Sequence, residues 1–380
     1  MAMLLDSTAT APTRYRLISS DDHVNLDHAS IKACLATKFH SDYDQALMDF
    51  GASMGALTSS KANAQWSEQR GVKPSTSSMG GNRNHPAFGR PGHTDPVARL
   101  ADMDADGVEA SASYCEVSAF RYLYLLRNGA QEATRAFNTA LAEFASADPA
   151  RLIVSYQIPI HDIDAAVAEV QWVAASGGKS IQLPVFPNEL GLPDYWHDRY
   201  DPLWAAIQET DLPICCHIGL NTMLDNLAQR DPTPQKGIFV PMTAMSTGEA
   251  LGMWIVGGVF ERFPKLKVVF VEPGVGWVAW WLFITDDLQA RQGYEFPAIS
   301  RKPSEYFHQN VYITFIDEPN VLRYGRERLG VKNLMWSSDY PHPVSSWPHS
   351  QRIVDEMFAD EDPTERDLVL YGNAQRVWNL

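Results

Sequence analysis

Acidic side chains and imidazoles end several apolar runs in this sequence, where a buried strand rarely carries either without a partner. The runs end in Ser-Asp-Asp-His around Asp21 and His23, in Cys-Cys-His at His217, in Phe-Val-Glu at Glu272 and in Ser-Ser-Asp at Asp339. Because Asp21 and His23 are two residues apart, an extended chain points both side chains to one face. Asp21, His23, His217 and Asp339 would offer one metal ion two nitrogens and two oxygens, which suits zinc and also manganese or iron.

Each of these residues also has an ordinary structural interpretation. Asp21 and Asp339 could each begin a turn, and a lone histidine such as His217 is more often a satisfied core residue than a ligand. Asp22 is interpreted as a solvated neighbour of the proposed ligands. It is the joint placement at strand ends that favours a common site.

The apolar runs have the length and β-branched content of buried strands. We predict eight strands, at Tyr15–Ser19, Val108–Tyr114, Leu152–Gln157, Lys179–Leu183, Leu212–Cys216, Lys267–Val271, Val311–Phe315 and Asn333–Ser337. Helical stretches lie between them, for example at Gln131–Ala145 and His161–Ala175. Parallel neighbours need crossover connections, so this alternation predicts a closed (β/α)8 barrel of the TIM type. An open doubly wound sheet is the alternative.

Two segments are too long for a minimal barrel. Residues 28–96 follow the first predicted strand, and residues 221–249 follow the fifth. In barrels, catalytic groups lie at the carboxyl ends of the strands and in the loops that follow them. Both insertions are therefore predicted to wall the active site, with residues 28–96 as a lid. Residues 14–380 then form a single barrel domain.

The composition excludes several classes of partner. The formal net charge is −15, whereas a nucleic-acid-binding protein needs a basic face and an anionic membrane would repel this chain. Four cysteines without CxxC spacing favour a reducing cytoplasm over a disulfide framework. We expect neither a signal peptide nor a membrane span, because the apolar stretches are short and interrupted. The sequence predicts a cytoplasmic protein that acts on a small molecule.

Aromatic residues gather around the proposed site and indicate a flat or apolar substrate. Trp277 and Tyr340 each follow a site residue closely, and we predict that both touch substrate. Arg121 is a candidate for binding a substrate carboxylate, because a guanidinium pairs with carboxylates in a bidentate way. A solvated surface charge is the alternative for Arg121. Arg99 is a second candidate for the substrate carboxylate, but a pair with an acid in Asp102–Asp104 is the preferred interpretation for it.

Longer motifs make the sequence resemble a known family. They are Ile18–Val24, Arg99–Asp104 with Gly107-Val108, Asp201–Trp204, Leu212-Pro213 with His217, Gly258–Lys267, Glu272–Gly274 with Gly276-Trp277, and Ser338–Pro343. With these motifs the chain resembles the amidohydrolase superfamily, in the branch of aminocarboxymuconate semialdehyde decarboxylase and γ-resorcylate decarboxylase. The resemblance covers nearly the whole chain from Arg14 onward.

The resemblance implies a distorted (β/α)8 barrel that holds one divalent metal ion, with zinc as the first expectation. Asp21 takes the place of the acidic first-strand ligand, and His23 matches the first-strand histidine. His217 matches the fifth-strand ligand and Asp339 the eighth-strand carboxylate. The resemblance and the aromatic content also suggest a homodimer.

The sequence departs from the family at one position that bears on the reaction. Many relatives carry a catalytic histidine after the sixth strand, where this chain has Glu272. His342, three residues after Asp339, could supply the missing imidazole. With Asp339 as the base for an activated water and Glu272 or His342 assisting, a hydrolase of a small aromatic or apolar carbonyl compound is the preferred interpretation. Non-oxidative decarboxylation of an aromatic or enol acid is the alternative, and a metal-free ligand-binding barrel is the third.

Overall fold

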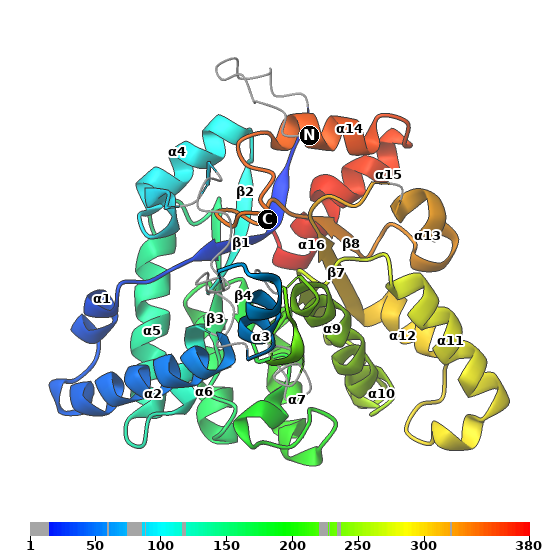
Figure 1. Ribbon diagram of the computed structural model, residues 1–380. Coiled ribbons are helices and arrows are strands. Elements are labelled where there is room, and N and C mark those ends of the chain that lie inside the picture. The colour runs from blue at the N-terminus through cyan, green and yellow to red at the C-terminus, as the bar shows by residue number, and fades with distance from the viewer. Residues whose placement is uncertain are drawn as a thin grey trace.

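The computed structural model describes residues 15–380 apart from 59–60, 74–85, 88, 116–118, 220–226, 228, 234–236 and 320. Eight parallel strands form one sheet in chain order, and helices surround it (Figure 1). The strands are β1 Ile18–Val24, β2 Ala110–Cys115, β3 Leu152–Gln157, β4 Ser180–Gln182, β5 Ile214–His217, β6 Val268–Val271, β7 Val311–Phe315 and β8 Leu334–Trp336. The predicted (β/α)8 barrel is confirmed. The alternative, an open doubly wound sheet, would reverse its strand order at some point, and this sheet does not.

The barrel closes between β1 and the segment that follows β8. The main-chain N–H of Asp339 donates to the carbonyl oxygen of Asp21 at 2.8 Å, and the N–H of His23 donates to the carbonyl oxygen of Tyr340 at 2.6 Å. Both hydrogen bonds involve residues of the proposed site or their neighbours. The hydrogen bonds that close the barrel therefore also bring the residues of the proposed site together.

The first strand differs most from its predicted bounds. It was expected to end at Ser19 but runs to Val24, so Asp21 and His23 lie within the strand. The register with β2 shifts between Ser19 and Asp22, and such a bulge re-aims side chains. All seven residues of β1 are buried. The predicted bounds of β3 and β7 match the structure, and the other strands differ by one or two residues at an end.

Helices surround the barrel, and α3 lies beside α9 in front of the strands in the view of Figure 1. They are α1 His28–Ala33, α2 His40–Thr58, α3 Lys61–Arg70, α4 Pro96–Asp106, α5 Ala130–Ala145, α6 Ile163–Ala175, α7 Asp201–Thr210, α9 Phe239–Ile255, α10 Val259–Arg262, α11 Val278–Arg291, α12 Pro303–Asn310, α13 Val321–Leu329, α14 Ser350–Phe358, α15 Pro363–Asp367 and α16 Asn373–Trp378. Within the described residues, no helix is apolar over a length that would cross a membrane.

Helix α4 shows how local sequence positions an element that later supports the site. The Asp95 side chain accepts hydrogen bonds from the N–H groups of Val97 and Ala98, at 2.8 and 3.0 Å, and so caps the first turn. Pro96 starts the helix, and Gly107 ends it with a φ of 73°. The helix thereby presents Arg99 and Asp102, both buried, to the outer face of the barrel wall.

The segment between β1 and β2 contains α1 to α4, and it reaches the segment after β5. Asn63 on α3 donates from its side-chain amide to the carbonyl oxygen of Pro232 at 3.0 Å. Residues 59–60, 74–85 and 88 of the predicted lid 28–96 lie outside the described residues. The same holds for 221–226, 228 and 234–236 of the second insertion, whose last part forms the start of α9. The lid stays a prediction.

Candidate metal centre and active site

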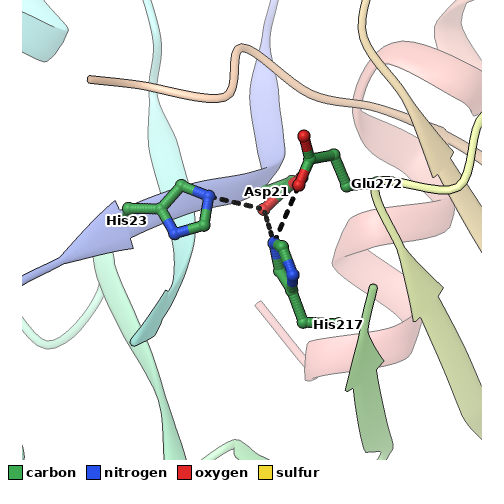
Figure 2. A group of neighbouring side chains, drawn as sticks. All are labelled: Asp21, His23, His217 and Glu272. Atoms are coloured by element: carbon green, nitrogen blue, oxygen red, sulfur yellow. Dashed lines mark ion pairs between the residues drawn. The ribbon is translucent and has the colours of Figure 1, made fainter. Parts of the chain in front are cut away.

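Five polar side chains meet at the carboxyl ends of the barrel strands. The His217 Nε2 atom lies 3.5 Å from Asp21 Oδ1 and 3.4 Å from Glu272 Oε2. The His23 Nε2 atom lies 3.8 Å from Asp21 Oδ1 and 3.1 Å from Asp339 Oδ1. Figure 2 shows the side chains from β1, from β5 and from the end of β6 pointing toward one another. The residues predicted to share a site are therefore close together.

His342 also belongs to this cluster. Its Nδ1 atom lies 3.0 Å from Asp339 Oδ1, and its ring stacks on that of His23 with centroids 3.8 Å apart and an angle of 27° between the planes. The side chain of His342 is 21% exposed, whereas that of Asp339 is fully buried. His342 and Glu272, whose side chain is 18% exposed, are thus the two members of the cluster that stand nearest to solvent.

Burial and crowding of like charges dominate the electrostatics of the cluster. Burial raises the pKa of Asp21 to about 7 and that of Glu272 to about 8, and repulsion from Asp339 adds to the rise for Glu272. Burial alone would lower the pKa of His217, but the Asp21 carboxylate beside it raises the value to about 9. Burial alone would raise the pKa of Asp339, but His342 lowers it to about 2. A positive charge is therefore favoured between these carboxylates.

The donor atoms fit a divalent cation. One ligand atom from each of Asp21, His23, His217 and Glu272 lies within 4.8 Å of all the others. A second set of this kind consists of His23, Glu272, Asp339 and His342. Among the described residues, both Asp21 oxygens, His217 Nε2 and Glu272 Oε2 are buried without a hydrogen bond beyond their ion-pair contacts. Imidazole and carboxylate are ligands that zinc and manganese accept.

Two residues of the cluster hold an unusual backbone conformation. Glu272 has a φ of 67° and Asp339 a φ of 55°, in the left-handed region that side chains other than glycine rarely adopt. Such a conformation costs on the order of 1–3 kcal/mol and persists where the surroundings over-determine it. The N–H of Glu272 donates to Thr314 Oγ1 at 2.8 Å, and that of Asp339 donates to β1. Both carboxylates follow the last residue of their strand closely and are thereby turned into the mouth.

The two predicted aromatic contacts to substrate are placed differently from each other. The Tyr340 hydroxyl donates to Asp102 on α4, and its ring packs on the Arg99 guanidinium with 4.6 Å to the ring centroid. This places the Tyr340 ring behind β1, and we propose no substrate contact for it. Trp277 donates from Nε1 to the carbonyl oxygen of Pro273 at 3.0 Å and packs beside α9. It thus lies close to the loop that begins at Glu272.

Asp22 and Arg99 correct two interpretations of the sequence. Asp22, expected to be solvated, is only 2% exposed. Arg99 was expected to pair with an acid in Asp102–Asp104, but its Nη1 atom lies 3.9 Å from Asp22 Oδ2. The Asp102 carboxylate instead accepts hydrogen bonds from Arg90 and from the hydroxyl of Tyr340. The cause is the bulge in β1, which turns Asp22 to the outer face of the strand, under α4.

Asp106, also on α4, leads to a prediction for stability. Burial raises its pKa from 3.8 to about 7, although Ser350 donates to it from N–H and Oγ. Because the folded state binds this proton more tightly, the stability that the group contributes at low pH is lost as the pH rises from about 4 to about 7.

Asp106→Asn keeps the shape without the charge. We expect its unfolding free energy to exceed that of the wild type by on the order of 1–3 kcal/mol at pH 8 and by less at pH 5. Urea unfolding measures both, and a difference independent of pH would contradict the prediction.

The chain matches the family described as Amidohydrolase over residues 66–380. It belongs to this family. γ-Resorcylate decarboxylase of Rhizobium sp. (strain MTP-10005) is 25% identical to it over 306 residues, which cover 74% of this chain and 86% of the relative. The 2-amino-3-carboxymuconate-6-semialdehyde decarboxylase of Dictyostelium discoideum is 23% identical over 289 residues, covering 75% and 77%. A 5-carboxyvanillate decarboxylase from Novosphingobium aromaticivorans, solved with manganese and 4-hydroxy-3-methoxy-5-nitrobenzoic acid, has a TM-score of 0.68 at 18% identity and covers 98% of this chain and 100% of its own.

These comparisons confirm the predicted superfamily and correct the predicted reaction. The sequence favoured a hydrolase, but the relatives within the family are decarboxylases, so that prediction is wrong and the alternative is better supported. The error came from treating Glu272 as the loss of an acid that relatives supply with a histidine. A buried carboxyl group can also serve as a general acid, so a glutamate at this position is compatible with decarboxylation.

Proposed function

We propose that this protein is a metal-dependent, non-oxidative decarboxylase of an aromatic or enol acid. The observation that supports it most is the convergence of Asp21, His23, His217, Glu272 and Asp339 at the mouth of the barrel. The activity of the relatives agrees with this assignment. In this proposal, the two imidazoles with Asp21 and Asp339 hold one divalent cation. Manganese, present in the similar carboxyvanillate decarboxylase, is preferred to the zinc that the sequence suggested.

The reaction replaces a carboxylate on carbon by a proton. A bound cation would supply Lewis-acid polarisation of a phenolic or carbonyl oxygen next to that carboxylate. Glu272 is proposed to deliver the proton from Oε2 to the carbon that bears the carboxylate. The C–C bond then breaks, its electron pair returns to the ring, and carbon dioxide leaves. His342, with Nδ1 held 3.0 Å from Asp339 Oδ1, is the second candidate for the acid.

The substrate is proposed to extend from the cluster toward a narrow neighbouring cavity, whose free volume of about 20 Å³ would have to widen to admit a ring. The cavity is lined by residues that follow β2, β4 and β5: Phe120, Arg121, Pro184, Val185, Phe186, Glu189, Leu190, His217, Ile218 and Gly219. The apolar and aromatic walls suit a ring, and Arg121 suits an anionic group on it. Because His217 belongs to both the cavity and the cluster, a substrate bound to the cation would lie at the end of this cavity.

Arg121→Met is expected to raise KM at least about tenfold with a smaller change in kcat, because it removes binding of the substrate anion away from the reacting carbon. Arg127→Met is a matched control, since Arg127 is exposed and lines a different surface depression. Steady-state kinetics on the two variants measures the effect. Equal KM values for the wild type and Arg121→Met would contradict a role in substrate binding.

The proposed reaction is tested by measuring carbon dioxide. The manganese-loaded protein is incubated with a panel of acids that the relatives suggest: γ-resorcylate, 5-carboxyvanillate and 2-amino-3-carboxymuconate-6-semialdehyde. We expect metal-dependent release of carbon dioxide from at least one of them, abolished by chelation. Cleavage of ester or amide substrates with no release of carbon dioxide from any acid would contradict the proposal.

A further inference from the structure

The carboxylate of Asp22 connects the two sides of the barrel closure. Its Oδ1 atom accepts hydrogen bonds from Ser19 Oγ at 2.9 Å, from Ser338 Oγ at 2.7 Å and from the main-chain N–H of Tyr340 at 3.0 Å. Its Oδ2 atom accepts one from Ser111 Oγ on β2. One buried side chain therefore ties β1 to β2 and to the segment that follows β8.

Arg99 extends this network to the main chain of a proposed ligand. It is fully buried, and its Nη1 atom lies 3.9 Å from Asp22 Oδ2. Its Nη2 atom donates to the carbonyl oxygen of His23, and its Nε atom donates to the carbonyl oxygen of Gly92 at 2.8 Å. The guanidinium thus compensates the buried charge of Asp22, which would otherwise be costly. The same group fixes the backbone beside His23.

The hydrogen bonds to Asp22 lie on both sides of Asp339. Ser338 donates to Asp22 from its hydroxyl and Tyr340 from its main-chain N–H, so both neighbours of Asp339 are held by one carboxylate. Asp339 itself has a φ of 55°. A residue in this sparsely populated conformation stays there only where its surroundings impose it. Asp22 accepts hydrogen bonds from both neighbours of Asp339, and Ser19 Oγ accepts one from the N–H of Ser338 at 2.9 Å.

We propose that Asp22 is a positioning residue for the metal site: its carboxylate holds Ser338 and Tyr340 so that Asp339 faces the cation. The inference rests on the metal site proposed above. Asp22 lies between two proposed ligands in sequence but on the opposite face of β1, where its partners are the serines, the tyrosine N–H and Arg99. Groups that orient metal ligands typically change metal affinity 10–100-fold when they are removed.

The test is the affinity for Mn²⁺, measured by competition with a chromogenic chelator on the full-length protein. Asp22→Asn keeps the shape of the side chain but gives up at least one acceptor. We expect it to weaken Mn²⁺ binding by about 10–100-fold with little change in far-UV circular dichroism. Asp106→Asn is the matched control, because Asp106 is similarly buried, lines the same small cavity and is hydrogen-bonded to Ser350. It should bind Mn²⁺ like the wild type.

Three outcomes would overturn the inference. Mn²⁺ affinity unchanged in Asp22→Asn would show that the carboxylate does not orient Asp339. Equal weakening in Asp22→Asn and Asp106→Asn would show a general effect of altering this cavity. If Asp22→Asn does not fold, Ser338→Ala removes one of the hydrogen bonds, should weaken binding about tenfold, and overturns the inference if it does not. A wild-type protein that binds no Mn²⁺ would instead refute the proposed metal site itself.

Discussion

Replacing His217 with alanine is expected to strip the protein of its metal and abolish decarboxylation. His217 is the donor from β5, and its Nε2 atom stands between the carboxylates of Asp21 and Glu272 at 3.5 and 3.4 Å. Without the imidazole, the carboxylates of Asp21 and Glu272 face each other and the cation loses a nitrogen ligand. We expect the metal content after desalting, measured by elemental analysis, to fall from about one ion per chain to a small fraction. We expect kcat to fall by more than about 100-fold, which is the upper end of the effect of removing a residue that only orients a ligand.

The control for this prediction is a histidine outside the barrel mouth. His308 lies near the end of α12, the helix that leads into β7. His308→Ala should keep both the metal and the activity. Full metal occupancy in His217→Ala, with a normal circular dichroism spectrum, would contradict the assignment of His217 as a ligand.

Glu272→Gln is expected to lower kcat by about 10²–10⁴-fold while the metal stays bound. The substitution keeps the size of the side chain but removes the proton that Oε2 is proposed to deliver to carbon, and this range is typical of a lost general acid. The limb of the pH–rate profile that reports the acid should disappear with it. Steady-state kinetics and elemental analysis on one preparation measure both effects.

Glu318→Gln is the control that separates chemistry from loop structure. The Glu318 carboxylate accepts hydrogen bonds from the N–H groups of Val275 and Gly276, so it holds the turn that follows Glu272. If Glu272 only stabilised this turn, both variants should behave alike. Normal kcat in Glu272→Gln would move the acid role to His342, and loss of metal in that variant would make Glu272 a ligand.

The fold and the position of the site were predictable because they depend on strong local patterns. Buried parallel strands read as short β-branched runs, and β3 and β7 have the predicted bounds. In a barrel the carboxyl ends of all strands meet, so polar residues at those ends converge whatever the loops do. His23 Nε2 and Asp339 Oδ1 lie 3.1 Å apart for this reason, although they come from opposite ends of the chain.

The orientation of single side chains was not predictable, because it depends on backbone irregularities that leave no pattern. The bulge in β1 turns Asp22 to the outer face of the strand, under α4, and nothing in Ser-Asp-Asp-His distinguishes a solvated acid from a buried one. The positive φ of Asp339 re-aims the next residue, so the ring of Tyr340 packs on Arg99 instead of lining the mouth. Side chains other than glycine rarely adopt this conformation, so sequence reasoning assumes the opposite.

The reaction was the other error, and it has a chemical cause. Hydrolysis and decarboxylation can both use a bound cation as Lewis acid, and they differ in whether a water is activated or a carbon is protonated. Residue types at strand ends indicate the metal ligands, but they do not show which of the two reactions occurs. The shape of the cavity beside His217 and the identity of the proton donor decide the reaction, and neither is a property of spacing in the sequence.

Decarboxylation in deuterium oxide tests the central claim most directly. The manganese-loaded protein is given γ-resorcylate, or whichever acid of the panel it turns over, and the products are analysed by mass spectrometry and NMR. The account predicts one carbon dioxide per turnover and one deuterium on the carbon that carried the carboxylate, both lost in His217→Ala. A product with no deuterium at that carbon, or turnover that releases no carbon dioxide, would contradict it.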